Sequence, residues 1–117
     1  MTDTPLTAYK VLTADQMAAL EKDGRFGGAP VDVTDGYIHL STAGQLTETV
    51  DKHFAGRQDL HVAAIDLAAH GDAVKWEESR GGQLFPHLYG EILLETVIAY
   101  GPLHRDDDGT VKLPVAG

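Results

Sequence analysis

The sequence predicts an α+β fold with a mainly antiparallel sheet and two helices in the N-terminal half of the chain. Three observations lead to this fold class. Two segments near the front carry helix-capping signals, five or six short segments have the composition of strands, and helices and strands do not alternate along the chain. The 117 residues suit a single domain, 1–117, with a core at about residues 8–101 and an acidic flexible tail at about residues 104–117.

The first elements are a strand and a capped helix. Residues 8–12 (AYKVL) indicate a short strand. Thr13 and Gln16 have the spacing of a capping box, which predicts a helix over residues 14–23. The segment that follows, residues 24–36 (GRFGGAPVDVTDG), is rich in glycine, so we expect an irregular loop that bends sharply or lets a ligand approach the backbone.

A second strand and helix come next. Residues 37–40 indicate a strand, and Thr42 and Gln45 form another capping box, which predicts a helix that runs to about residue 55. Three apolar residues are spaced to share one face of this helix: Leu46, Val50 and Phe54.

The second half of the chain consists of short strands joined by turns. A loop is expected at residues 79–86 (SRGGQLFP), and residues 111–115 are expected to form an edge strand or a frayed end. Strands are expected at four places: residues 59–67, 73–77, 87–94 and 96–100.

The composition narrows the classes of function. The formal net charge is −9, and the nine lysines and arginines are scattered, so we expect no nucleic-acid-binding surface. A small anionic, nucleotide-like ligand held by two or three placed cations is compatible with this charge. The start of the chain has no basic or long apolar signal region, and no apolar run approaches the roughly 20 residues of a membrane span. We therefore expect a cytoplasmic protein with no membrane partner, as a monomer or a weak dimer.

Cysteine and histidine usage argues against a metal site. The chain has no cysteine, which excludes disulfides, thiol nucleophiles and cysteine metal ligands. The six histidines show no HxH, HxxxH or HExxH spacing. No metal is expected.

Two predicted strands each carry a row of polar side chains opposite an aliphatic row, because side chains alternate along a strand. In the first strand, Tyr37, His39 and Ser41 share one face, and the opposite face is apolar. In the second, His87, Tyr89 and Glu91 share one face in the same way. If the strands are near neighbours, one polar cleft is lined by Tyr37, His39, His87 and Tyr89. The alternative is that the histidines are structural, each satisfied by a neighbouring hydrogen bond.

Further candidates lie near the ends of elements. Ser41 or Thr42 is expected to cap a helix whose first N–H groups form an anion site. Lys10 is an isolated cation on a candidate cleft wall. Glu77 and Arg80 belong to a segment that is expected to be either a solvated loop or a mobile loop that places a carboxylate near a ligand.

The segments DGYIHLSTAGQ, KWE and FPHLYG, in this order after YKVL, resemble a bacterial family of unknown function, DUF952, over about residues 9–100. That family resembles the ADP-ribosyltransferase superfamily, whose members bind NAD in the cleft of a split antiparallel sheet. Within it, IHLS is similar to the histidine strand of the RNA 2′-phosphotransferases. The resemblance therefore implies an ADP-ribosyltransferase-like split sheet.

The resemblance also implies roles for particular residues. His39 and Ser41 match the strand that contacts the nicotinamide end of NAD. Lys10 departs from the pattern, because it lies where the superfamily carries a histidine that holds a ribose. The superfamily's acid corresponds to Glu77 or Glu91. Breaking the nicotinamide–ribose bond develops oxocarbenium character, which a nearby carboxylate stabilises.

These observations predict a protein that binds NAD or an ADP-ribose-type nucleotide, with an ADP-ribosyl- or 2′-phosphotransferase-like activity in which NAD is the substrate. The alternative is a non-catalytic module that kept the fold and recognises a metabolite or a protein. The expected catalytic residues are His39, Glu77 and His87. The expected ligand-binding residues are Lys10, Tyr37, Ser41, Thr42, Arg80, Tyr89 and Glu91.

Overall fold

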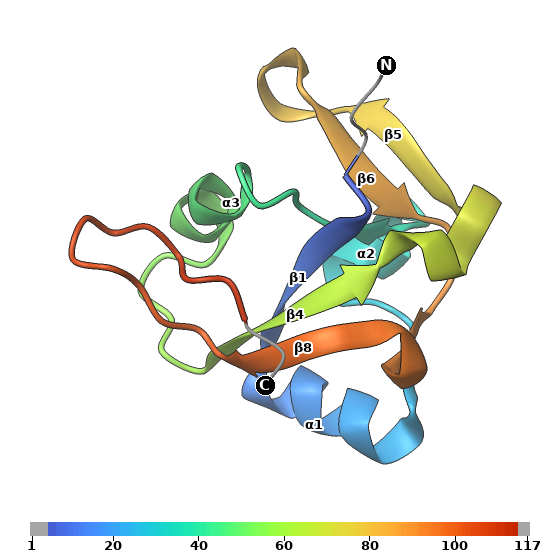
Figure 1. Ribbon diagram of the computed structural model, residues 1–117, viewed down its shortest axis with the longest axis horizontal. Coiled ribbons are helices and arrows are strands. Elements are labelled where there is room, and N and C mark those ends of the chain that lie inside the picture. The colour runs from blue at the N-terminus through green and yellow to red at the C-terminus, as the bar shows by residue number, and fades with distance from the viewer. Residues whose placement is uncertain (1–4, 115–117) are drawn as a thin grey trace.

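The structure, a computed structural model, describes residues 5–114, and the side chain of Arg80 lies outside the description. A three-stranded sheet forms its centre (Figure 1), with strand order β1-β4-β8 and antiparallel pairing throughout. Its strands are β1 (Thr7–Thr13), β4 (Leu60–Asp66) and β8 (Val97–Pro102).

Two smaller antiparallel sheets accompany the central one. One has the order β3-β6-β5, and the other pairs β2 with β7. A bridge between Tyr9 and Ser41 joins β1 to the chain just after β3. The strands are β2 (Arg25–Phe26), β3 (Ile38–His39), β5 (Val74–Glu78), β6 (Leu84–Leu88) and β7 (Ile92–Leu93). The expected α+β class with antiparallel sheets is confirmed.

Short helices cover the sheets. In Figure 1, α1 lies along the β8 side of the central sheet and α3 lies on the β1 side. The α-helices are α1 (Ala14–Asp23), α2 (Pro30–Asp35) and α3 (Leu46–His53), and the 3₁₀ helices are η1 (Leu67–Ala73), η2 (Arg80–Gly82) and η3 (Leu94–Thr96).

Helix α1 forms as its capping box predicts. The Thr13 hydroxyl accepts a hydrogen bond from the Gln16 backbone N–H at 3.2 Å, and the Gln16 side chain accepts one from the Thr13 N–H at 2.9 Å. Gly24 ends the helix with φ +76°, a left-handed conformation that glycine adopts without strain. Met17 and Leu20 are buried against the sheet.

The glycine-rich segment is not an irregular loop throughout, because it contains β2 and α2. Pro30 begins α2, where its missing N–H costs nothing, and Gly36 ends it with φ +88°. The Asp32 carboxylate accepts a hydrogen bond from the Ala29 N–H at 2.8 Å, as in the second half of a capping box. Because the capping residue is an alanine, the sequence carries no polar N-cap signal that would predict the start of this helix.

Helix α3 begins at Leu46 rather than at Thr42. The Gln45 side chain does accept a hydrogen bond from the Thr42 N–H at 3.0 Å, but this bond closes a turn before the helix. The helix also ends earlier than expected, at His53. Leu46 and Val50 are buried, as the apolar stripe predicts.

The expected strand over residues 87–94 is wrong. Strand β6 starts at Leu84, inside the expected loop, and ends at Leu88. A bend at Tyr89 and Gly90 then separates it from β7, which belongs to another sheet. Strand β8 follows η3, which contains Thr96, so it starts one residue later than expected.

Two clusters of buried residues hold the elements together. The larger one joins buried residues of α1, of the central sheet and of strands β2, β3, β6 and β7. The smaller one lies under α3 and includes Val111, whose N–H donates to the Thr47 hydroxyl at 2.9 Å. Val115, part of the expected last strand, lies outside the described residues. Within residues 5–114, no helix is long and apolar enough to cross a membrane.

Candidate functional site

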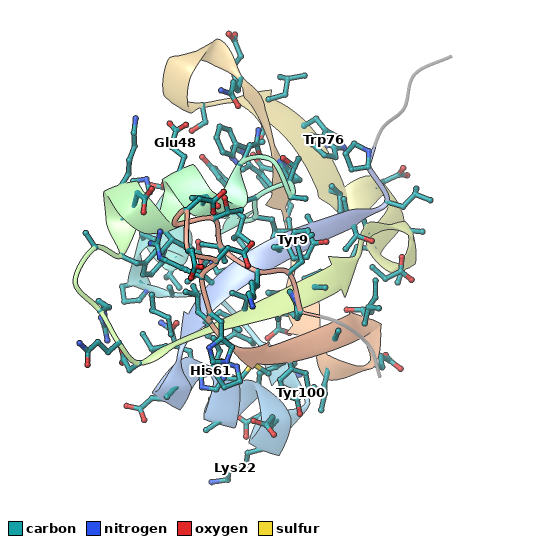
Figure 2. All side chains as sticks on the ribbon, turned by 60° about the vertical axis from the view of Figure 1, so that its left-hand side comes forward. Tyr9, Lys22, Glu48, His61, Trp76 and Tyr100 are labelled. Atoms are coloured by element: carbon teal, nitrogen blue, oxygen red, sulfur yellow. The ribbon has the colours of Figure 1, made fainter. Side chains whose placement is uncertain are left out.

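A cavity of about 640 Å³ opens between β1, α2, β3 and α3. Its volume is within the range of roughly 300–1,000 Å³ that is typical of small-molecule sites. Tyr9 projects from β1 (Figure 2) and is one of several aromatic residues on its wall. Four of the sequence-predicted site residues line the cavity: Lys10, His39, Ser41 and His87.

His39 and His87 meet at the wall of this cavity. They are direct partners in the β3–β6 ladder, and their ring centroids lie 5.5 Å apart with the planes at 67°. Tyr37 stacks on the His87 ring at a centroid distance of 4.1 Å and lies 4.7 Å from the His39 ring. The structure thus brings together Tyr37 and His39 of the first row with His87 and Tyr89 of the second, and of these four the two histidines line the cavity.

Asp32 of α2, which sequence reasoning missed, anchors His39. The carboxylate is 1% exposed, and its Oδ1 atom lies 2.7 Å from His39 Nδ1 and 3.0 Å from the His39 backbone N. Lys10 Nζ lies 2.9 Å from Oδ2. With the Ala29 N–H, the carboxylate has four donor groups, so it is fully satisfied although it is buried.

Burial and pairing act in opposite directions on these charges. Burial tends to raise the pKa of Asp32, but the hydrogen bond from His39 and the charge of Lys10 outweigh it, so this pKa lies well below its usual range. Burial lowers the pKa of Lys10, and the attraction of Asp32 opposes that shift.

Lys10 is therefore not the free cation on the cleft wall that the sequence suggests. Its side chain is 7% exposed, and besides Asp32 it donates to the His39 carbonyl oxygen at 3.0 Å. A lysine held in this way ties β1 to α2 and β3, and its charge is already compensated.

Asp35, the last residue of α2, provides a second carboxylate for His39. Its Oδ2 atom lies 3.0 Å from His39 Nε2, and its side chain is 41% exposed where it lines the cavity. The spacing of four residues across a left-handed Gly36 brings the two side chains together. His39 is thus held between one buried and one exposed carboxylate.

His87 belongs to a second chain of hydrogen bonds. Its Nδ1 atom lies 2.8 Å from Glu77 Oε1, and the Tyr89 hydroxyl donates to the same oxygen at 2.7 Å. The hydrogen bonds from Tyr89 and His87 lower the pKa of Glu77, and the bond to Glu77 raises the pKa of Tyr89 to about 12. Glu77 and Tyr89 position His87 from outside the cavity lining.

The remaining sequence-predicted residues have other surroundings. The Ser41 hydroxyl is 2.9 Å from the Thr49 hydroxyl, which ties the segment after β3 to α3. Thr42 precedes α3 by four residues, so it is not the expected helix cap, and it does not line the cavity. Glu91 lies across the bend and faces Arg25 at 4.0 Å. The described part of Arg80 is its backbone, in η2.

The cavity continues toward the end of β1 at Thr13. Arg57, after α3, lines this part and holds Asp59 with two hydrogen bonds of 2.9 and 2.6 Å. Sequence reasoning missed Arg57, because its neighbours in the sequence do not indicate which distant strand it lies against. Among residues 5–114, no group of three or more acidic or histidine side chains is arranged to hold a metal ion.

Comparisons with known proteins identify a family and similar solved structures. Residues 11–100 match the family described as protein of unknown function, DUF952. The crystal structure of protein CC0527 from Caulobacter crescentus is similar with a TM-score of 0.83 and 41% identity, covering 92% of this chain and 94% of that one. The solution NMR structure of CC0527 gives a TM-score of 0.77 at 41% identity, covering 90% of each chain. No curated protein matches the chain.

Proposed function

The chain belongs to the DUF952 family, and from that premise and the geometry of the site we propose that its cavity binds a ribonucleotide of the NAD or ADP-ribose type. One observation carries the proposal: His39 and His87, each hydrogen-bonded to its own carboxylate, are partners on neighbouring strands and line the same cavity. Two oriented imidazoles offer hydrogen bonds to the hydroxyl groups or phosphates of such a ligand.

Two further features support a nucleotide as the ligand of this cavity. Aromatic residues line the cavity beside the histidines, and a ring of this kind stacks on a nucleobase. The IHLS segment is similar to the histidine strand of the RNA 2′-phosphotransferases, and the Tyr9–Ser41 bridge joins two separate antiparallel sheets, which is compatible with the split sheet of the ADP-ribosyltransferase superfamily.

The geometry favours binding over turnover. The charge of Lys10 is paired with Asp32, and Glu77 is hydrogen-bonded to His87 and Tyr89, so both side chains are already engaged inside the protein. Asp35 is the observation in favour of an enzyme, because it is a carboxylate on the cavity wall where it could stabilise an oxocarbenium-like ribose. An ADP-ribosyltransferase-like activity is therefore the second candidate.

Ligand-observed NMR tests the binding proposal. NAD and ADP-ribose at millimolar concentration should show saturation transfer from the wild-type protein and from His104→Ala, an exposed histidine outside this cavity. His39→Ala should lose the effect at a temperature at which circular dichroism shows that this variant is still folded, because the substitution also removes a hydrogen bond to the buried Asp32. Absence of transfer to either nucleotide from folded wild-type protein would overturn the proposal. Release of nicotinamide from NAD, abolished in His39→Ala, would identify the enzyme instead of the binding module.

A further inference from the structure

The two carboxylates that hold His39 differ in their freedom to move. Asp32 is 1% exposed, and its oxygens accept from Lys10, Ala29 and His39. Asp35 is 41% exposed and lines the cavity. A ligand that reaches His39 therefore meets a fixed ring on one side and a carboxylate that can turn toward solvent on the other.

The charges at this wall favour some ligand groups over others. Lys10 lies within 3.2 Å of both Asp32 oxygens and 3.0 Å from the His39 carbonyl oxygen, so its charge is compensated inside the protein. Asp35 is the second carboxylate on the same ring, and His39 can donate to both carboxylates only with a proton on each ring nitrogen. The positive charges of Lys10 and of that ring then balance the two carboxylates, so a further anion at this wall has no cation to pair with. An anionic group placed on Nε2 would lie next to the Asp35 carboxylate, and like charges in contact are strongly unfavourable.

A hydroxyl group suits the same place. A hydroxyl carries one donor and two acceptor lone pairs, so it can accept from the imidazole N–H and donate to a carboxylate at the same time. The Asp35 Oδ2 atom is 3.0 Å from Nε2 in the closed contact. A small rotation of the exposed Asp35 side chain would make room for one oxygen atom between them.

We propose that Asp35 determines specificity at this wall: a neutral sugar hydroxyl of the ligand inserts between Asp35 and His39, and an anionic group is rejected. The proposal rests on the proposed function and makes it more specific, because it assigns the ribose and not a phosphate to the His39 end of the cavity. The phosphates then lie away from Asp35.

The test follows the ¹⁵N signals of the His39 ring while D-ribose and inorganic phosphate are added separately at high millimolar concentration. In the wild type, ribose should shift these signals and phosphate should leave them in place. Asp35→Ala should weaken the ribose effect by about tenfold or more, the scale of one hydrogen bond to a charged group, and should admit phosphate. Asp35→Asn keeps a donor and an acceptor without the charge, so it should retain ribose and also admit phosphate.

Asp107→Asn, an exposed carboxylate in the turn after β8, removes the same charge and should behave as the wild type. Three results would overturn the inference. The first is ribose binding that is unchanged in Asp35→Ala, and the second is phosphate binding at His39 in the wild type. The third is the absence of any response to either probe in every variant. A response to ribose with no binding of NAD or ADP-ribose would overturn the proposed function and leave this inference standing. Binding of NAD or ADP-ribose that does not depend on Asp35 would overturn this inference and leave the proposed function standing.

Discussion

The Nδ1 atom of His39 lies 2.7 Å from a buried oxygen of Asp32. The same carboxylate binds Lys10 of β1 and the backbone at the start of α2. This contact connects three elements and fixes the orientation of the imidazole. The most distinctive group of the cavity wall is therefore also part of what holds the fold together.

Asp32→Asn should lower the free energy of unfolding by about 3–5 kcal/mol, because it leaves the buried Lys10 without its counter-charge. Urea denaturation measures the change. Asp23→Asn, at an exposed position at the end of α1, should change stability by less than about 0.5 kcal/mol. Equal, small effects of the two substitutions would contradict the account.

Lys10→Met should cost less than Asp32→Asn, about 1–3 kcal/mol. The reason is an asymmetry in the network: without the lysine, Asp32 keeps the His39 ring and two backbone N–H donors. Without Asp32, the lysine keeps one carbonyl oxygen. The same denaturation measurement compares the two, and a larger loss for Lys10→Met would show that the network is centred on the cation.

The free energy of unfolding should depend on pH in the acidic range because of Asp32. Its folded-state pKa is lowered, so between that pKa and the unfolded value of about 4 the unfolded chain binds more protons. The stabilisation is fully present above about pH 4 and is lost as the pH falls through the folded-state pKa. The difference in unfolding free energy between the wild type and Asp32→Asn should shrink on acidification below pH 4. A difference that stays constant would contradict this role.

Much of the fold follows from local signals. Helix α1 was predicted with its ends, because the capping box at Thr13 and the glycine after the helix both act within a few residues. Helix α2 was missed, since it has six residues and an alanine at the capping position. The break after β6 was missed because the alternation of side chains continues through Tyr89 and Gly90 into a strand of another sheet.

The site was predicted only in part, because some of its contacts follow from local patterns and others join residues far apart in the sequence. The pairing of His39 with His87 follows from two strands with matching polar rows, once the strands are neighbours. The partner of Lys10 lies 22 residues further along the chain, so no local pattern could show that the lysine is buried. The contact of Asp35 with His39 could in principle be predicted, because the two residues are only four apart in the sequence. It depends, however, on the turn at the end of α2.

Glu77→Gln should lower the pKa of Tyr89 from about 12 toward its ordinary value near 10, because the carboxylate that disfavours the phenolate is removed. Ultraviolet titration of the tyrosines measures it, with Tyr89→Phe identifying the signal. Glu78→Gln, the exposed neighbour in β5, should leave the titration unchanged. A high pKa that survives Glu77→Gln would show that another group holds the phenol protonated.

The central claim is that His39 and His87 form one wall of a nucleotide-binding cavity. The most direct test is a histidine side-chain ¹⁵N NMR titration of the wild-type protein with ADP-ribose. The account predicts saturable shifts of the His39 and His87 signals, with no shift of the three histidines that do not line the cavity: His61, His70 and His104. Unmoved His39 and His87 signals at saturating ADP-ribose, or shifts confined to those other three, would contradict it.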